Sequence, residues 1–380
     1  MQIEKLSNAV DAKKLLQTLG VDGGGISILQ SKMQQHILYI RELHVGAANI
    51  LKQDALSIGA DLAVPRGTVI AKTPYVDCIL IATQKQLQLL SKKELAQPFG
   101  LKELAQELQE IVKIHKPWHV EIMGIINAND DSFYSASRFH GSKAIESIEQ
   151  MISDGASIID IGGVSSRPNS LKVSADEELE RVKPIIDMLS QEKLSTKAQF
   201  SIDSYEPKVI AYALENGFKI INDITGLQSD EVCRLCAEYG ATAVIMHMQG
   251  EPQTMQDSPH YENILSDVYT FFQERVSKAE SFGIKEIVLD VGIGFGKRLQ
   301  DNLMLIKHLE NFLRLKKPLL VGASRKSLID TISPSTIEER LAGTLALHLE
   351  SAQNGASILR VHDVKEHVQA IKIKEALSRV

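Results

Sequence analysis

The sequence predicts a (β/α)8 barrel, or TIM barrel, over residues 118–380, preceded by a small α/β domain over residues 1–115. From Trp118 onward, short apolar or β-branched runs alternate with charged, amphipathic stretches. Eight such pairs occur, over a length close to the roughly 250 residues of a typical barrel. The first part of the chain lacks this alternation. A doubly wound sheet is the alternative architecture, and the number of pairs favours the barrel.

The predicted barrel strands are continuous apolar runs, as expected of strands that are buried on both faces. In order they are Val120–Asn127, Ile158–Ile161, Phe200–Asp203, Lys219–Asn222, Ala243–His247, Ile287–Asp290, Leu319–Gly322 and Ile358–Val361. The predicted covering helices include Ser142–Ser153, Ala175–Ser190, Pro207–Asn216 and Glu262–Phe282. Glycine follows several helical patterns where a left-handed C-terminal cap is expected, at Gly155, Gly217, Gly240, Gly283 and Gly355.

The N-terminal domain is predicted from shorter signals. Its expected strands are Ile26–Leu29, Ile37–Ile40, Val69–Ala71 and Val76–Ala82, and its expected helices are Ala47–Ile58 and Leu101–Ile114. Lys113–Trp118 should join it to the barrel. The cluster Asp22-Gly-Gly-Gly25 lacks the strand-to-helix spacing of a phosphate loop, so we expect a flexible turn there. No chemistry is indicated, and a structural accessory is the expected role.

Composition excludes several classes of protein. Hydrophobic residues make up 44% and charged residues 24%, as in a globular protein with a large core, and the net charge of -6 gives no reason to expect nucleic acid as a partner. No secretory signal or membrane-spanning run is present, so we expect a cytoplasmic protein without a membrane partner. Cys233-x-x-Cys236 has no second cysteine pair, which favours ordinary helix residues over a metal or redox site.

Polar residues follow every predicted barrel strand. They are Asn127, the Gly162–Pro168 loop, Asp203, Asn222-Asp223, His247, Asp290, the Ser324–Ser327 loop, and Arg360 with His362. In a parallel barrel these ends converge on the face where active sites form. A strand-end Asp or Asn is often only a helix cap, but a polar group after each strand predicts a polar mouth.

The residue types in this mouth suit a phosphorylated heterocycle. Arg167, Arg360 and His362 offer donors for phosphate oxygens. Asp203 and Asp290 offer acceptors for ring N–H and amino groups. In the alternative interpretation these charges only neutralise one another as ion pairs. His247 alone can equally be a packed histidine or a working one.

Familiar nucleotide and hydrolase motifs are absent from the sequence. Gly292-Ile-Gly-Phe-Gly296 is followed by Lys297 where a dinucleotide fingerprint requires its last glycine. Lys297 is followed by Arg298, so the Ser or Thr of a phosphate-binding P-loop is missing. No G-x-S-x-G elbow or H-E-x-x-H helix occurs.

Seven motifs in one order resemble those of the dihydropteroate synthases. The run from Met123 to Phe133 is similar to the first-strand signature M-G-I-L-N-V-T-P-D-S-F, and Gly155–Pro168 is similar to G-A-D-I-I-D-I-G-G-E-S-T-R-P. The others are Ser201–Tyr205, Ile221–Gly226, Asp290–Lys297, Gly322–Ser327 and Arg360–Asp363. The resemblance covers about residues 118–375. It implies the barrel fold and the condensation of 6-hydroxymethyl-7,8-dihydropterin diphosphate with p-aminobenzoate to give 7,8-dihydropteroate and diphosphate.

The resemblance also implies a role for each matching residue. Asp203, Lys326 and Arg360 would be catalytic. The pterin ring would be held by Asp203, Asn222, Asp290 and Lys326. Asn127 would bind Mg2+ beside the diphosphate, whose oxygens would meet Arg167, Arg360 and His362. The p-aminobenzoate pocket would be formed by Phe133, Ser166, Pro168, Phe295 and Ser327. Relatives commonly form homodimers through barrel helices.

The chain departs from these signatures at several positions. Asn129-Asp130 replaces the usual T-P of the first loop, and Ser135 replaces its second aspartate. Asp130 is a candidate substitute for that lost carboxylate. Val164 replaces the Glu of the second signature. Two alternatives remain: a pterin-binding methyl-transfer barrel, which would not need a diphosphate clamp, and a catalytically weakened pterin-binding module.

Overall fold

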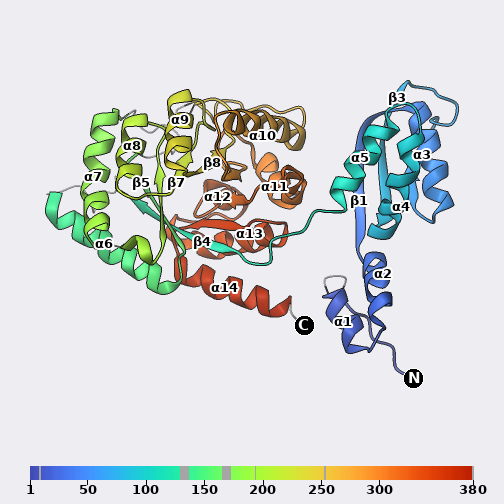
Figure 1. Ribbon diagram of the computed structural model, residues 1–380, viewed down its shortest axis with the longest axis horizontal. Coiled ribbons are helices and arrows are strands. Elements are labelled where there is room, and N and C mark those ends of the chain that lie inside the picture. Colours follow the sequence, from blue (N-terminus) through green and yellow to red (C-terminus); the bar gives the residue numbers. More distant parts are fainter. Residues whose placement is uncertain (8–9, 129–136, 165–172, 193, 252–253, 379–380) are drawn as a thin grey trace. The chain divides into compact units, whose positions relative to one another are not determined.

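The computed structural model describes residues 1–7, 10–128, 137–164, 173–192, 194–251 and 254–378, with backbone alone for 137–142. The chain divides into two compact units (Figure 1). Lys116–Lys374 forms one, and the other consists chiefly of Met1–His115. Among the described residues, no helix has the length and apolar character needed to cross a membrane.

The larger unit is the predicted barrel. Its strands are β4 (Glu121–Asn127), β5 (Ile158–Gly162), β6 (Gln199–Asp203), β7 (Ile220–Asp223), β8 (Thr242–Met246), β9 (Ile287–Asp290), β10 (Leu319–Val321) and β11 (Ile358–Val361). All neighbours are parallel, and the ring closes in the order β10-β11-β4-β5-β6-β7-β8-β9. The prediction of eight parallel strands is confirmed.

Helices follow the strands and cover the outside of the barrel (Figure 1). They are α6 (Ser137–Asp154), α7 (Ala175–Glu192), α8 (Pro207–Glu215), α9 (Asp230–Tyr239), α10 (Ile264–Ser281), α11 (Leu299–Lys307), α12 (Ser327–Ile332), α13 (Leu341–Gln353) and α14 (Val364–Leu377), with short 3-10 turns η2 (Leu194–Thr196), η3 (Leu309–Leu315) and η4 (Glu338–Arg340). The five predicted cap glycines all have positive φ, from 60° at Gly240 to 109° at Gly155. This backbone conformation suits glycine and ends the helices where the sequence predicts.

Two layers of side chains fill the barrel unit. The larger lies between strands and helices. The smaller plugs the interior and consists of Met123, Ile158, Ile220, Val244, Val288, Leu320 and Ile358. Strand side chains alternate between faces, so the residues two positions later also point inward. Four of these are polar: Asp160, Asn222, Asp290 and Arg360. An apolar plug therefore forms the floor beneath a polar layer.

The smaller unit is an antiparallel sheet with helices. Its strands pair in the order β1-β3-β2, and their ranges are Gln35–His44 for β1, Asp61–Ala63 for β2 and Tyr75–Thr83 for β3. Its helices are α1 (Ala12–Thr18), α2 (Gly23–Met33), α3 (Val45–Ser57), α4 (Gln84–Lys93) and α5 (Leu101–Ile111), with a 3-10 turn η1 (Glu94–Ala96). A separate apolar core holds it together.

Three predictions for this unit are wrong. Ile26–Leu29 is not a strand but part of α2, because its apolar residues have helical spacing, with Met33 continuing the series. The Asp22–Gly25 cluster is not a turn, since α2 begins at Gly23. Val69–Ala71 is a turn and not a strand: the Ala71 N–H bonds the Thr68 carbonyl, and Ala71 has a φ of +52°.

Candidate functional site

The carboxyl ends of β4, β5, β6 and β7 form one level of the barrel. Their ladder aligns Asn127 with Gly162, Gly162 with Asp203, and Asp203 with Asn222. Three residues predicted from separate motifs therefore stand side by side along the rim. Asn222 is buried and Asn127 is half-buried.

Arg360 crosses the barrel mouth to two carboxylates. Its Nε donates to Asp160 Oδ2 at 2.6 Å, and its Nη2 donates to Asp203 Oδ2 at 2.5 Å. Asn222 Nδ2 donates to the same Asp160 oxygen at 3.0 Å. The predicted residues Asp203, Asn222 and Arg360 thus meet through Asp160. The two carboxylates raise the pKa of Arg360, so the guanidinium stays charged.

Of the two predicted acids of the mouth, Asp290 is buried and Asp203 is half-buried, and ionisation of both is costly. Burial raises the pKa of Asp203 to about 7, with Arg360 and Lys326 opposing the shift. Burial also raises the pKa of Asp290, against the Gly292 N–H that donates to its Oδ1 at 2.8 Å. The positive charges of Lys326 and Arg360 lower the pKa of both carboxyls and so oppose the effect of burial. A ligand that brings N–H donors would compensate these acids.

The loop after β10 brings a cation onto an aromatic ring. Lys326 Nζ lies 4.1 Å from the centroid of Phe295, within the range of a cation–π contact. Ser327 begins α12 and is exposed. Lys326, Phe295 and Ser327 therefore belong to adjoining parts of the mouth.

The same loop is bound to the loop after β11. Ser324 Oγ lies 2.9 Å from His362 Nδ1 and also accepts the His362 N–H at 3.3 Å. The Arg325 guanidinium donates two hydrogen bonds to the Asp363 carboxylate, of 2.6 and 3.1 Å. The loops that carry Lys326 and His362 are thus joined to each other.

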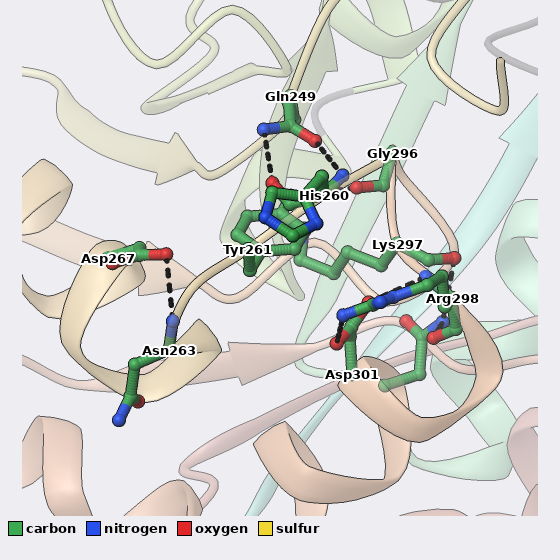
Figure 2. A network of polar contacts seen from close by, with 10 residues as sticks. Gln249, His260, Tyr261, Asn263, Asp267, Gly296, Lys297, Arg298 and Asp301 are labelled. Atoms are coloured by element: carbon green, nitrogen blue, oxygen red, sulfur yellow. Dashed lines mark hydrogen bonds and ion pairs between the residues drawn. The ribbon is translucent and has the colours of Figure 1, made fainter. Parts of the chain in front are cut away.

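The loop after β9 is fixed by side-chain donors (Figure 2). Lys297 is buried, and its ammonium donates to the carbonyls of His247, Gly292 and Phe295 at 2.9–3.0 Å. Tyr261 Oη donates to the Gly296 carbonyl at 2.7 Å. These contacts tie the β9 loop to the end of β8 and hold Phe295 in place.

Close backbone contact explains glycine at two positions of this loop. A Cβ on Gly292 would lie 2.0 Å from the His247 oxygen, and one on Gly296 would lie 2.3 Å from the Gln249 oxygen. Gln249 is held in turn by two hydrogen bonds to the His260 backbone, of 2.9 and 3.0 Å (Figure 2). Close packing of the β8 and β9 loops therefore requires glycine at both positions.

His247 is a packed histidine. It is buried, its ring contacts Phe271 edge-on at 4.8 Å between centroids, and burial lowers its pKa to about 2. Cys233 and Cys236 are also ordinary helix residues, both buried in α9 and unpaired. Burial raises the pKa of both thiols, which opposes reactivity.

Part of the expected site lies outside the described residues. Phe133, Ser166, Arg167 and Pro168 fall there, as do Asp130 and Ser135. Within the described ranges, no group of three or more His, Cys, Asp or Glu side chains could hold a metal ion.

Two residues of the site were missed from the sequence. Asp160 stands within a quoted motif, and the alternation of strand side chains could have placed it inward, two residues after Ile158. From the sequence, Lys297 was noted only because it replaces the last glycine of a dinucleotide-binding fingerprint. Its role depends on three backbone carbonyls from two loops, and no sequence pattern indicates that arrangement.

Comparisons with known proteins identify the family of this chain. The profile of the family "Pterin binding enzyme" matches residues 123–362. A Helicobacter pylori protein named bifunctional dihydropteroate synthase/dihydropteroate reductase is 44% identical over 379 residues, 99% of each chain. The Escherichia coli dihydropteroate synthase is 41% identical over 262 residues, which is 68% of this chain and 92% of that protein.

Similarity to a solved structure extends the comparison to the fold. The Xanthomonas albilineans dihydropteroate synthase with 4-aminobenzoic acid superposes with a TM-score of 0.64 at 36% identity, covering 69% of this chain and 94% of that one. The matched share corresponds in size to the barrel unit, where the seven motifs lie. This chain belongs to the pterin binding enzymes and, within them, to the dihydropteroate synthases.

Proposed function

We propose that the chain joins 6-hydroxymethyl-7,8-dihydropterin diphosphate to p-aminobenzoate, with the residues of the mouth in defined roles. The observation that carries this proposal is the guanidinium of Arg360 between Asp160 and Asp203, above an apolar floor. Around it stand acceptors for a pterin edge and cations for a diphosphate. The barrel therefore offers complementary groups to both halves of one substrate.

The pterin would be held by its ring edge. Asp203, Asn222 and Asp290 supply acceptors and an amide above the apolar floor, where the ring would be excluded from water. Lys326 would donate to the ring from the β10 loop. Because desolvation raises the pKa of both acids, hydrogen bonds from the pterin N–H and amino groups would stabilise their ionised forms. These hydrogen bonds would make the site specific for a pterin ring.

Diphosphate would leave first. The methylene C–O bond breaks and both of its electrons depart with diphosphate, so a pterin methyl cation remains. Arg360, His362 and Arg167 would bind the departing oxygens, and Asp290 would stabilise the cationic ring. The amine nitrogen of p-aminobenzoate then forms the new C–N bond and releases its proton to solvent.

A magnesium ion fits this arrangement. Mg2+ is commonly bound through one or two protein oxygens together with substrate phosphates and waters. Asn127 offers one side-chain oxygen at the rim, and it forms no hydrogen bond to another described residue that would occupy it. When bound there, the ion would neutralise charge on the diphosphate. Whether Asp130 adds a carboxylate remains a separate proposal, tested by Asp130→Asn.

The p-aminobenzoate would lie above the pterin. Phe295 and Ser327 would line its pocket, with Phe133, Ser166 and Pro168. Lys326 Nζ lies over the Phe295 ring, and the carboxylate of the second substrate would approach this cation. The loops that supply these residues come from four different strand ends.

The decisive experiment measures diphosphate release with and without p-aminobenzoate. We expect release to depend on both substrates and to fall in Asp290→Asn, while Asp230→Asn, an exposed carboxylate on α9, serves as control. Pterin binding without turnover would favour a weakened module instead. Methyl transfer from methyltetrahydrofolate without diphosphate chemistry would favour the other alternative.

A second candidate function concerns the N-terminal unit. The Helicobacter pylori relative carries reductase in its name, and its similarity includes this unit because it spans 99% of the chain. Reduction of dihydropteroate needs a hydride and a proton. We propose to follow oxidation of a reduced nicotinamide by the full chain with dihydropteroate. If the nicotinamide is not oxidised in a dihydropteroate-dependent way, this candidate function is ruled out.

Assembly and location remain proposals. We infer a homodimer formed through barrel helices, which sedimentation of the full chain would test. A reducing cytoplasm suits three cysteines that are buried and unpaired.

A further inference from the structure

Two buried histidines connect the β10 loop to the β11 loop. His348 of α13 and His367 of α14 are each 1% exposed, and their facing nitrogens are 2.9 Å apart. At one end of the pair, His348 Nε2 lies 2.9 Å from the N–H of Ala323. At the other end, His367 Nδ1 lies 2.6 Å from the carbonyl oxygen of Asp363. None of the roles proposed above uses these imidazoles.

The hydrogen bonds allow one arrangement of protons. The Ala323 N–H can only donate, so His348 Nε2 accepts and the ring carries its proton on Nδ1. That proton is donated to His367 Nε2, which leaves the proton of His367 on Nδ1. His367 Nδ1 then donates to the Asp363 carbonyl, which can only accept. Every bond in the chain is satisfied only when both rings are neutral.

The electrostatic surroundings agree with neutral rings. Burial lowers the pKa of His348, and His367 and His362 add to that effect. Burial also lowers the pKa of His367, with Asp363 and Glu366 opposing the shift.

Helix α13, together with Arg340 directly before it, holds the β10 loop with a row of side chains spaced four residues apart. His348 accepts from Ala323 N, Thr344 Oγ1 accepts from Arg325 N at 3.0 Å, and Arg340 donates to the Arg325 carbonyl at 3.2 Å. Residues four apart lie on one face of a helix, so this face follows the loop backbone. The loop needs such support because Arg325 has a φ of +55°, a strained conformation for a residue with a side chain.

The contacts close into a ring. From the Ala323 N–H the ring passes through His348 and His367 to the backbone carbonyl of Asp363. The Asp363 carboxylate accepts from the Arg325 guanidinium, and the backbone from Arg325 to Ala323 closes the ring. The ring encloses the starts of the two loops. Lys326 directly follows Arg325, and Arg360 and His362 lie just before Asp363 in the sequence.

We propose that His348 and His367 are positioning residues, which fix the spacing of the β10 and β11 loops so that Lys326, Arg360 and His362 face one ligand. They act through backbone groups and do not touch the substrate. The inference rests on the proposed function, since the ligand in question is the pterin diphosphate.

The first test is a two-bond 1H–15N correlation spectrum of the histidines in the full chain. Both His348 and His367 should show the neutral form with the proton on Nδ1. An Nε2-protonated or doubly protonated ring at either position would overturn the proposal. The spectrum uses the unaltered protein, so it does not depend on any variant folding.

The second test separates positioning from folding by kinetics. His348→Leu removes both hydrogen bonds, whereas His348→Gln keeps an acceptor for Ala323 N–H. We expect the KM for the pterin diphosphate to rise about 10-fold in His348→Leu, given how steeply rates and binding depend on placement, and to rise less in His348→Gln. Ser351→Ala is the matched control, because Ser351 is a buried polar residue of α13 whose hydroxyl, among the described residues, bonds only the Leu347 carbonyl.

The outcomes are distinguishable. A purely structural role would lower kcat through loss of folded protein and leave the KM of both variants unchanged, which would overturn the proposal. If His348→Leu does not fold, His348→Gln and the spectrum decide. If the unaltered chain shows no synthase activity, the proposed function fails, and an incorrect tautomer would still overturn the histidine connection separately.

Discussion

Arg360 Nε donates to Asp160 Oδ2 at 2.6 Å, although the two residues are 200 positions apart in the chain. Strands β11 and β5 are both neighbours of β4, so the two side chains approach from either side of that strand. Asp160 is fully buried, and only one of its oxygens has a hydrogen-bond partner among the described residues. The contact holds the guanidinium over the floor of the barrel.

Asp160→Asn should weaken this placement. The variant removes one negative charge beside Arg360 and also one of the charges that raise the pKa of Asp203. We therefore expect kcat/KM to fall by about 100-fold, consistent with loss of a preorganised charged contact. The acidic limb of any pH–rate profile that depends on Asp203 ionisation should move to lower pH. Steady-state rates from pH 5 to 9 measure both effects, and an unchanged profile would contradict this electrostatic account.

Much of the fold was predictable because the barrel is built from local signals. Each strand is a short apolar run, and five of the helices end at a glycine, so the count of eight followed from the sequence alone. The N-terminal unit gave fewer signals. The helical segment Ile26–Leu29 and the turn Val69–Ala71 contain the same residue types as strands, and three or four residues are too few for composition to separate them from strands.

The part of the candidate site that lies at strand ends could be predicted from the sequence. Asp203, Asn222, Asp290 and Arg360 each follow an apolar run, and parallel strands bring their ends together. Lys297 could not be assigned in this way, because its acceptors are backbone carbonyls that sequence letters do not show. Contacts between helices, such as His348 with His367, are likewise fixed only by tertiary packing.

Lys297→Met should loosen the β9 loop. Methionine has a similar length but leaves the carbonyls of His247, Gly292 and Phe295 without their donor. Unsatisfied buried carbonyls cost about 1–3 kcal/mol each before relaxation, so we expect a loss of stability of about 2–4 kcal/mol. The KM for p-aminobenzoate should rise as well, because Phe295 loses its anchor. Chemical denaturation and initial rates measure the two effects.

Lys307→Met provides the control for that variant. Lys307 pairs with Glu350 on the surface, its side chain is 69% exposed, and exposed pairs contribute little. Equal losses in both variants would show that the buried ammonium has no special role.

Glu178→Gln should stabilise the protein at high pH. Burial raises the pKa of Glu178 from 4.5 to about 7. Between these values the folded state binds a proton that the unfolded state has lost, so stability falls as pH rises from about 4.5 to 7. The amide cannot ionise, and the variant should gain about 1–3 kcal/mol over the parent at pH 8. Urea unfolding at pH 5 and pH 8 tests this, and the same difference at both pH values would contradict it.

Gly296→Ala should be more damaging than another substitution at a left-handed glycine. Gly296 has a φ of +59°, and a Cβ there would meet the Gln249 carbonyl oxygen at 2.3 Å. Gly283 has a φ of +88° with no atom within 4 Å of its Cβ position. Gly283→Ala should therefore cost only the conformational strain, about 1–2 kcal/mol. Gly296→Ala adds a backbone clash that separates the β8 and β9 loops, so it should cost at least about 2 kcal/mol more and raise the KM for p-aminobenzoate. Urea unfolding and initial rates on both variants distinguish these costs, and equal losses would mean that close contact between the two loops is not what requires glycine at position 296.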